Sequence, residues 1–405
     1  MIRVIHGVAN PQFEKVTQVF SDQLNQLGGG AALCIYWQGE AVLDIWSGFR
    51  DEYNNPWTKN IGCMSYSTSK GVLATLLHIA MEEAGISYDT RIAKIWPSFK
   101  QNFKDKLTIK DALCHQTGLA DLSRIIESES DIFDWDQMIW SIAKTASSHD
   151  QVNRSAYHAM TFGWIIGEII HRLTGMKPSQ MLEYTLKPIM GRQNYFSVPQ
   201  RHLQNTAQIL KKPPQSLNET WYRNLRSHLG RTLKNKVNLQ TKNIINRSAR
   251  VTGSIWPLID TIGTVDVNSR AFLQAEIPAI NGVFTARGLA SLYSMLLTGH
   301  FEDKQYLSAQ RVKLIGKVQN RDSDLIIRIP MHWRLGYQRV LNTKRQVPNG
   351  FGHLGFGGSG AFCDRDRSLA VGFVNNSLWA SPLSDTRFAH LAGTILATCD
   401  HLIKK

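Results

Sequence analysis

The sequence lacks the long apolar stretch that a membrane-spanning helix needs. No apolar run in the 405 residues approaches twenty residues, which argues against a transmembrane segment. Residues 1–11 contain neither a seven-residue apolar block nor a small-residue cleavage site. We therefore expect no secretory signal and a cytoplasmic location.

Motifs that bind metals and cysteine spacings typical of disulfide frameworks are also lacking. The chain has no His-Glu-x-x-His motif and no Cys-x-x-Cys spacing. Its five cysteines are an odd number and lie inside apolar segments, which is typical of reduced core residues: Cys34, Cys63, Cys114, Cys363 and Cys399. We expect no metal site, no cofactor and no disulfide framework.

Acidic residues are rare in one part of a basic chain. The whole sequence has 46 Lys and Arg against 32 Asp and Glu, a net charge of +14. Residues 211–250, here called the basic segment, hold ten of these cations and one acid, Glu219, and so contribute +9. The segment predicts a solvated insertion, and contact with an anionic membrane or an acidic substrate is the less favoured alternative. Its only aromatic residues are Trp221 and Tyr222, so we expect no nucleic-acid partner.

The chain does contain a hydroxyl and an amine three residues apart at the start of an apolar helix. Ser67 and Lys70 precede the apolar run of residues 72–80, which predicts a helix with both side chains on one face. Lys70 can then hydrogen-bond the Ser67 hydroxyl. Free N–H groups in the first helical turn also favour an oxygen that is losing its proton. This arrangement predicts a serine that forms an acyl intermediate.

Neither this spacing nor a glycine-rich motif is specific by itself. Ser-x-x-Lys recurs at Ser141 and Lys144, but that serine falls in the middle of a predicted helix, so we interpret this copy as structural. Residues 355–360 match Gly-x-Gly-x-x-Gly, yet a strand rather than a helix follows them. We therefore expect no nucleotide site there.

Three further motifs follow Ser67 in a characteristic order. They are Leu-x-His-x-Thr-Gly around His115, a tyrosine triplet at Tyr157, and His-x-Gly at His353. In this order the motifs resemble those of the class C β-lactamases and penicillin-binding-protein-like serine hydrolases. Within that superfamily the chain most resembles the family VIII-like carboxylesterase branch, over about residues 16–396.

The resemblance implies roles for individual residues. Tyr157 would deprotonate Ser67 and later activate water, and we expect the neighbouring Lys70 to lower the pKa of its phenol. The backbone N–H groups of Ser67 and Phe356 would form the oxyanion hole. His115 would shape a turn, and the scattered tryptophans are predicted to lie in the core or the pocket wall: Trp140, Trp164, Trp333 and Trp379.

Two departures from the family pattern concern the substrate. The usual Tyr-x-Asn ends here in Ala159, which removes an amide that could bind a lactam or peptide. The usual Lys-Thr-Gly is replaced by His353, Leu354 and Gly355, which exchanges a fixed cation for an imidazole that is largely neutral at pH 7. We place Ala159, His353 and Gly355 among the substrate-binding residues and expect esters rather than β-lactams.

The predicted function is a serine hydrolase that cleaves small carboxylic esters through an acyl-Ser67 intermediate. Two enzymatic alternatives remain open on the same fold. One is hydrolysis of β-lactams or of D-amino-acid amides and peptides, and the other is acyl transfer to an alcohol or amine. The non-enzymatic alternative is a scaffold that binds a membrane or another anionic partner through the basic segment.

The predicted fold is α/β (α+β), of the β-lactamase and transpeptidase type. Hydrophobic periodicity predicts a helix over 11–26, a hairpin over 31–37 and 41–46, strands over 361–362 and 369–375, and a helix over 385–402. Both ends of the chain should therefore build one antiparallel sheet flanked by the terminal helices.

The domain boundaries follow from the same pattern. We predict a sheet domain from residues 1–90 plus 256–405, and a mainly helical inserted domain over 91–255 that includes the basic segment. Ser67, Tyr157 and His353 should meet at the seam between the two.

Overall fold

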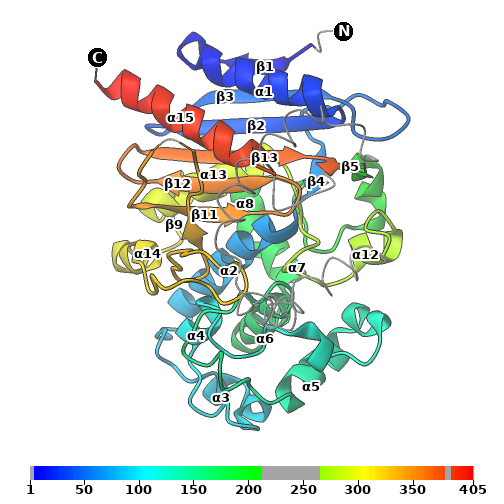
Figure 1. The fold of residues 1–405 in the computed structure, drawn as a ribbon, viewed down its shortest axis with the longest axis vertical. Coiled ribbons are helices and arrows are strands. Elements are labelled where there is room, and N and C mark those ends of the chain that lie inside the picture. Colours follow the sequence, from blue (N-terminus) through cyan, green and yellow to red (C-terminus); the bar gives the residue numbers. More distant parts are fainter. Residues whose placement is uncertain (1–3, 212–264, 344, 379–384, 405) are drawn as a thin grey trace, which may run out of the picture.

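A seven-stranded antiparallel sheet organises the upper half of the molecule in Figure 1. The computed structural model describes residues 4–211, 265–343, 345–378 and 385–404. In spatial order the strands are β1 (His6–Ala9), β3 (Glu40–Gly48), β2 (Gly30–Trp37), β13 (Leu369–Asn375), β12 (Gly360–Asp364), β11 (Gly350–Leu354) and β10 (Gln338–Arg339). The sheet thus joins the two ends of the chain, as predicted.

Strand β13 closes the sheet across more than 300 residues of sequence. Its seven residues pair antiparallel with β2, from Leu369 opposite Trp37 to Asn375 opposite Ala31. All seven are buried because helices cover both faces of the sheet. Helices α1 (Glu14–Leu27) and α15 (Arg387–Ile403) lie on one face, and α13 (Ala286–Thr298) packs against the other (Figure 1).

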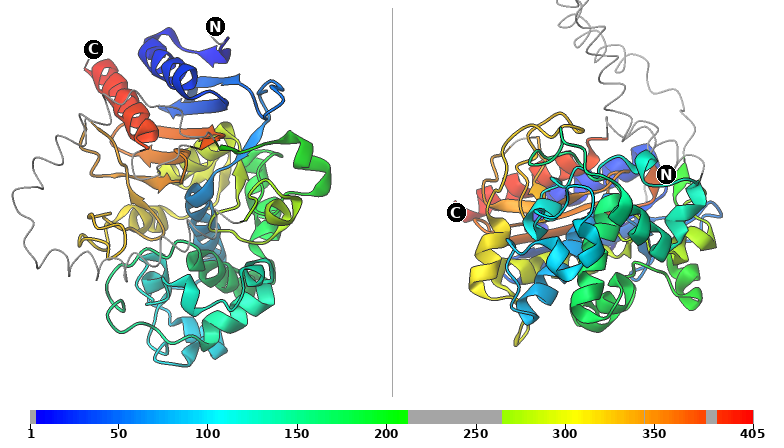
Figure 2. Two further views of the ribbon diagram at one scale, coloured as in Figure 1. Left: turned by 45° about the vertical axis from the view of Figure 1, so that its right-hand side comes forward. Right: turned by 90° about the horizontal axis from the view of Figure 1, so that it is seen from below.

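Helix α2 (Ser69–Glu83) connects the sheet with the helical half of the molecule. Its residues from Ser69 to Met81 are all buried, so it has no solvent face over most of its length. The helices below the sheet in Figures 1 and 2 are α3 (Ile92–Ile95), α4 (Ile109–Leu113), α5 (Trp135–Lys144) and α6 (Thr161–Thr174). Helix α6 packs against α2 and is apolar enough to be buried over its first ten residues.

The remaining regular elements are short and lie around this framework. A three-stranded sheet has the order β5 (Thr206–Ala207), β4 (Gly62–Met64) and β7 (Val283–Phe284). Strand β6 (Leu210–Lys211) pairs with β14 (Ser377–Leu378), and β8 (His300–Phe301) pairs with β9 (Lys304–Gln305). The other α-helices within the described ranges are α7 (Pro178–Met181), α8 (Lys187–Met190), α12 (Arg270–Gln274) and α14 (Ala309–Gly316).

Most of the elements predicted from periodicity are confirmed. The hairpin is β2 and β3, which turn at Gln38 and Gly39, and the terminal helices are α1 and α15. The five cysteines are free and buried. Trp140 does not lie in the core, because its side chain is 50% exposed, with the Lys144 ammonium 3.6 Å from its ring centroid, but it does line a cavity at the surface.

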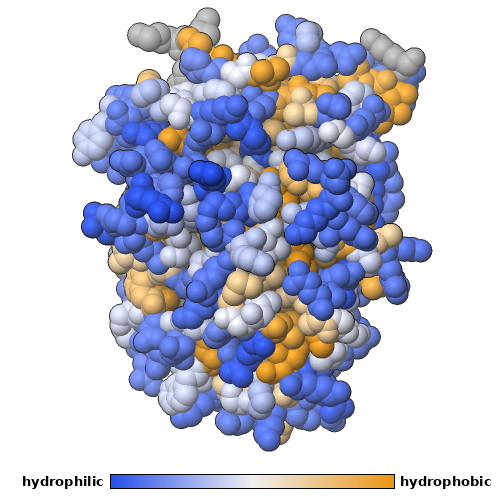
Figure 3. Space-filling view, turned by 180° about the vertical axis from the view of Figure 1, so that it is seen from behind, coloured by the Kyte–Doolittle hydropathy of each residue, from blue (hydrophilic) through white to orange (hydrophobic). Residues whose placement is uncertain are grey.

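Other predictions are not decided by these residues. The domain boundaries at residues 90 and 255 stay a prediction, and residue 255, Trp379 and all of the basic segment beyond Lys211 lie outside the described residues. Within the part that is described, no helix is both long and apolar enough to cross a bilayer. The face opposite to that of Figure 1 is largely hydrophilic, with apolar side chains in separate patches (Figure 3).

Candidate active site

Ser67 is the one solvent-accessible residue in a buried stretch of chain. It lies in a short 3₁₀ turn (Tyr66–Thr68) that runs directly into α2. Among residues 61–81, all of which the structure describes, every side chain except that of Ser67 is buried. Tyr66 before it has a φ of 45°, a conformation that non-glycine residues rarely adopt and that is typical of functional turns. The chain therefore presents a single hydroxyl from a rigid, water-excluding support.

The Lys70 amine lies beside this hydroxyl and is completely buried. Its Nζ lies 3.1 Å from Ser67 Oγ and donates to the Ala159 carbonyl at 2.6 Å and to the Ala279 carbonyl at 3.1 Å. Burial lowers the pKa of Lys70 well below its usual value because the ammonium loses its hydration. The two carbonyls take both N–H groups of a neutral amine, so its lone pair faces Ser67 Oγ and can accept a proton from it.

A close contact between two elements places one of these carbonyls. Ala279 belongs to the segment before β7, and Gly163 of α6 lies directly against it. A Cβ atom at Gly163 would lie 2.6 Å from the Ala279 nitrogen, closer than any side chain could fit. The absence of a side chain at Gly163 thus lets this segment reach the amine of Lys70.

Tyr157 lies on the other side of Lys70, in a pocket of rings. Its phenol ring stacks on Trp333, with centroids 5.8 Å apart and planes 6° apart, and the Lys70 Nζ lies 5.0 Å from its centroid. The rings of His115 and His353 lie 5.0 and 6.3 Å from it. The structure thus brings together the side chains that the sequence motifs single out.

The expected lowering of the Tyr157 pKa is not found. Burial raises the pKa of Tyr157, a hydrogen bond with the Ser67 hydroxyl lowers it, and the charge of Asp324 raises it. Lys70 does not act as the expected cation, because its own burial favours the uncharged amine. The resting site therefore favours a neutral phenol beside a neutral amine.

His353 and Gly355 come from the end of β11, across from the Ser67 turn. The His353 Nδ1 bonds the Leu354 carbonyl at 3.1 Å and therefore carries the proton, so Nε2 is a buried acceptor that has no partner among the described residues. A Cβ at Gly355 would lie 2.2 Å from the Ser65 carbonyl oxygen. Glycine at this position therefore lets the strand end reach the Ser67 turn, where the Phe356 ring lies 5.3 Å from that of Tyr66.

Ala159 enters the site through its backbone rather than its side chain. Its carbonyl accepts from Lys70, while its methyl group is only 3% exposed. His115 has a φ of 60° and accepts the His158 N–H on its Nδ1 at 3.1 Å, as expected for a residue that shapes a turn. The second Ser-x-x-Lys copy is unlike the first, since Ser141 is buried within α5 and Lys144 is exposed.

Comparison with known proteins agrees with this geometry. The family model described as Beta-lactamase matches residues 16–394. The chain belongs to the beta-lactamase family. It is 30% identical to the esterase/beta-lactamase LipL of Mycobacterium tuberculosis, over all of this chain and 89% of that protein. The predicted family and fold type are therefore confirmed.

Solved structures of the family share the whole fold. A family VIII carboxylesterase is 25% identical with a TM-score of 0.81, over 98% of this chain and all of that one. A penicillin-binding protein homologue from Caulobacter crescentus is 24% identical, also with a TM-score of 0.81 and the same coverage. The latter likeness concerns the fold alone.

Sequence reasoning missed Asp324, a buried carboxylate behind Tyr157. Its Oδ1 accepts the backbone N–H groups of Tyr157, Ile326 and Ile327 at 3.2, 2.8 and 2.9 Å, and its Oδ2 accepts the Trp333 indole N–H at 3.1 Å. One side chain thus fixes both the backbone of Tyr157 and the ring stacked on it. The only signal in the sequence is an acid directly before the apolar triplet 325–327, which is too common to identify a site.

We expect Asp324→Asn to destabilise the protein by about 2–3 kcal/mol, because the new amide N–H groups would face buried donors. The matched control is Asp322→Asn, two residues away and exposed, which should change the free energy of unfolding by less than about 0.5 kcal/mol. Urea unfolding followed by circular dichroism measures both. Equal midpoints for the two variants would contradict the assigned hydrogen bonds.

The histidines around Tyr157 predict a loss of stability in mild acid. Burial lowers the pKa of His353 to about 3 and the pKa of His158 to about 4. In the unfolded chain both histidines have a pKa of about 6.5. Above that pH they are neutral in the folded and in the unfolded protein, so their contribution to the free energy of unfolding is constant. Below it, protons bind preferentially to the unfolded chain, at a cost of up to about 1.4 kcal/mol per pH unit for each group until the folded pKa is reached.

The measurement is urea unfolding at a series of pH values between 7 and 5. His353→Gln should make the decline shallower, whereas His401→Gln, at an exposed position of α15, should leave the slope unchanged. If the free energy of unfolding falls with pH equally steeply in the parent, His353→Gln and His401→Gln proteins, His353 ionises in the folded state as it does in the unfolded chain.

Proposed function

We propose that the protein is a serine hydrolase that cleaves small carboxylic esters through an acyl intermediate on Ser67. The observation that carries this proposal is the accessible Ser67 hydroxyl, hydrogen-bonded to the buried amine of Lys70 and to Tyr157. Membership of the beta-lactamase family and similarity to a protein named an esterase/beta-lactamase support the same reaction class.

Lys70 and Tyr157 act in this proposal as one base. Neutral amine with neutral phenol, and ammonium with phenolate, contain the same number of protons and differ only in where one proton sits. Burial favours the neutral form at rest. Either form can accept one proton from Ser67, which leaves an ammonium beside a neutral phenol.

Acylation then proceeds with a balanced transfer of that proton. Ser67 Oγ attacks the ester carbonyl carbon as its proton passes to the pair, and the backbone N–H groups of Ser67 and Phe356 stabilise the oxyanion. When the carbon–oxygen bond to the alcohol breaks, Tyr157 gives its proton to the leaving oxygen and regains one from Lys70. Water then attacks the acyl carbonyl carbon as its proton passes to the pair. The bond to Ser67 Oγ breaks, Oγ regains a proton, and the carboxylic acid is released.

The substrate side of the site favours esters over β-lactams. His353 holds the position of the family's usual lysine, and burial lowers its pKa to about 3, so it offers no positive charge to a substrate carboxylate. Its unpartnered Nε2 can accept a hydrogen bond but not bind an anion. Ala159 offers no side-chain amide. A cytoplasmic location and the absence of a nucleic-acid partner remain predictions.

The proposal predicts turnover of p-nitrophenyl acetate and butyrate, with a burst of p-nitrophenol when deacylation is the slower step. Ser67→Ala should abolish turnover, while Ser141→Ala, in the structural copy of the motif, should retain it. Nitrocefin should be hydrolysed far more slowly than either ester. Nitrocefin turnover that matches ester turnover would favour the β-lactamase alternative instead, and no turnover of any of these substrates would contradict the proposal.

Removal of the phenol oxygen tests the shared base. Tyr157→Phe keeps the ring stacked on Trp333 but cannot carry a proton, so kcat should fall by about 10²–10⁴-fold. The control is Tyr53→Phe, because Tyr53 is 79% exposed whereas Lys70 is buried. Steady-state kinetics on p-nitrophenyl butyrate measures both variants. A kcat for Tyr157→Phe within a few fold of the parent would leave Lys70 alone as the base.

A further inference from the structure

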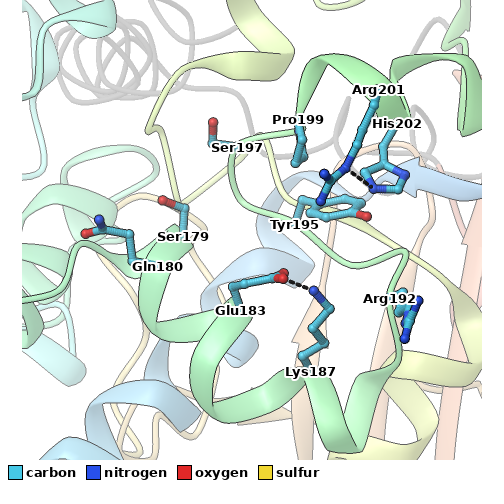
Figure 4. Close-up of a pocket in the computed structure, with 10 residues that line it drawn as sticks. All are labelled: Ser179, Gln180, Glu183, Lys187, Arg192, Tyr195, Ser197, Pro199, Arg201 and His202. Atoms are coloured by element: carbon cyan, nitrogen blue, oxygen red, sulfur yellow. Dashed lines mark hydrogen bonds and ion pairs between the residues drawn. The ribbon is translucent and has the colours of Figure 1, made fainter.

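A cavity lined by cationic side chains is formed by residues other than those of the Ser67 site. Figure 4 shows its lining. It has a volume of about 710 Å³, within the size range of ordinary ligand pockets. Its walls come from α7, α8, the turn of π-helix between them (Leu182–Leu186) and the segment that leads to residues 200–205. The lining includes no residue of the candidate active site, which contains Ser67, Lys70, Tyr157 and His353.

Basic side chains converge on this cavity in greater number than acids. Lys187, Arg192, Arg201 and His202 line it, and Glu183 is the one carboxylate among the lining residues. Glu183 pairs with Lys187. Neither Arg192 nor Arg201 forms an ion pair with a carboxylate of the described residues. Two guanidinium charges are therefore left uncompensated at one site.

The basic groups are close enough to affect one another. Burial and then the charges of Arg192 and Arg201 lower the pKa of Lys187, and burial followed by Arg201 and Lys187 lowers the pKa of His202. Such mutual repulsion is relieved when an anion binds between like charges. The protein thus retains an arrangement of charges that an anionic ligand would stabilise.

The position of Arg201 in the cavity wall is fixed by contacts with His202 and Tyr195. Arg201 Nε donates to His202 Nε2 at 3.1 Å, so the proton of the neutral imidazole lies on Nδ1. That Nδ1 is buried and has no hydrogen-bond partner among the described residues. The Tyr195 ring stacks on the imidazole, with centroids 5.3 Å apart, and holds its orientation. Because this Nδ1 is buried, it does not face the cavity, and the imidazole instead positions the Arg201 side chain beside it (Figure 4).

We propose that this cavity binds the phosphate group of an anionic ligand between Arg192 and Arg201. Guanidinium groups bind phosphate oxygens through paired, charge-assisted hydrogen bonds. The basic segment of the same chain carries charge of the same sign, so it does not supply the anion. Binding here is independent of ester hydrolysis at Ser67. A free phosphorylated molecule and a phospholipid headgroup share the required chemistry.

The test measures binding of inorganic phosphate and pyrophosphate to the full-length protein by isothermal titration calorimetry. Arg192→Gln and Arg201→Gln should each weaken binding by about fivefold or more, and the double variant more than either. Lys15→Gln removes one positive charge from an exposed position of α1 and should have no effect. Thermal unfolding of each variant shows whether it is folded, and added salt should weaken binding.

A second arm distinguishes the two sources of phosphate. Sedimentation with phosphatidylcholine vesicles that contain phosphatidylglycerol is compared with sedimentation with phosphatidylcholine vesicles alone. Binding to the anionic vesicles only, reduced in both arginine variants, assigns the cavity to a lipid headgroup, whereas binding of the free anions assigns it to a soluble ligand. If neither probe binds, or if Arg192→Gln and Arg201→Gln behave like Lys15→Gln, the proposal is overturned.

Discussion

The buried amine of Lys70 is the constraint on which the rest of the site depends. A charged or hydrogen-bonding group without access to water must have all of its partners supplied by the protein. Here the partners come from three separate parts of the chain: the Ser67 hydroxyl, the carbonyl before α6 and the carbonyl before β7. The Lys70 nitrogen therefore contacts three segments that are far apart in the sequence.

The architecture around this nitrogen leaves little freedom for the reacting groups. Helix α2 is buried over most of its length. Gly355, at the end of β11, lies so close to the Ser67 turn that no side chain would fit at this position. Asp324 fixes Tyr157 from behind through the backbone and through Trp333. Pre-organisation of this kind reduces the reorganisation needed in the transition state, which is a main source of enzymatic rate enhancement.

Local patterns in the sequence were enough to predict the family, the hairpin, the terminal helices and the closeness of Ser67 to Lys70. The rest depends on contacts between residues that are far apart in the chain. Asp324 lies 167 residues from Tyr157, and Ala279 lies 209 residues from Lys70, so no local pattern marks either contact. The direction of the Tyr157 pKa shift was mispredicted because it depends on burial, which the sequence does not specify. The exposure of Trp140 was missed for the same reason.

The central claim is that one hydroxyl, activated by a buried amine, is the nucleophile. Intact-mass spectrometry after exposure to a fluorophosphonate tests this claim without any assumption about the substrate, since only an activated serine reacts rapidly. The predicted result is a single adduct that peptide mapping assigns to Ser67, and no adduct on Ser67→Ala protein. An adduct on another serine, or an unmodified parent protein, would contradict the account.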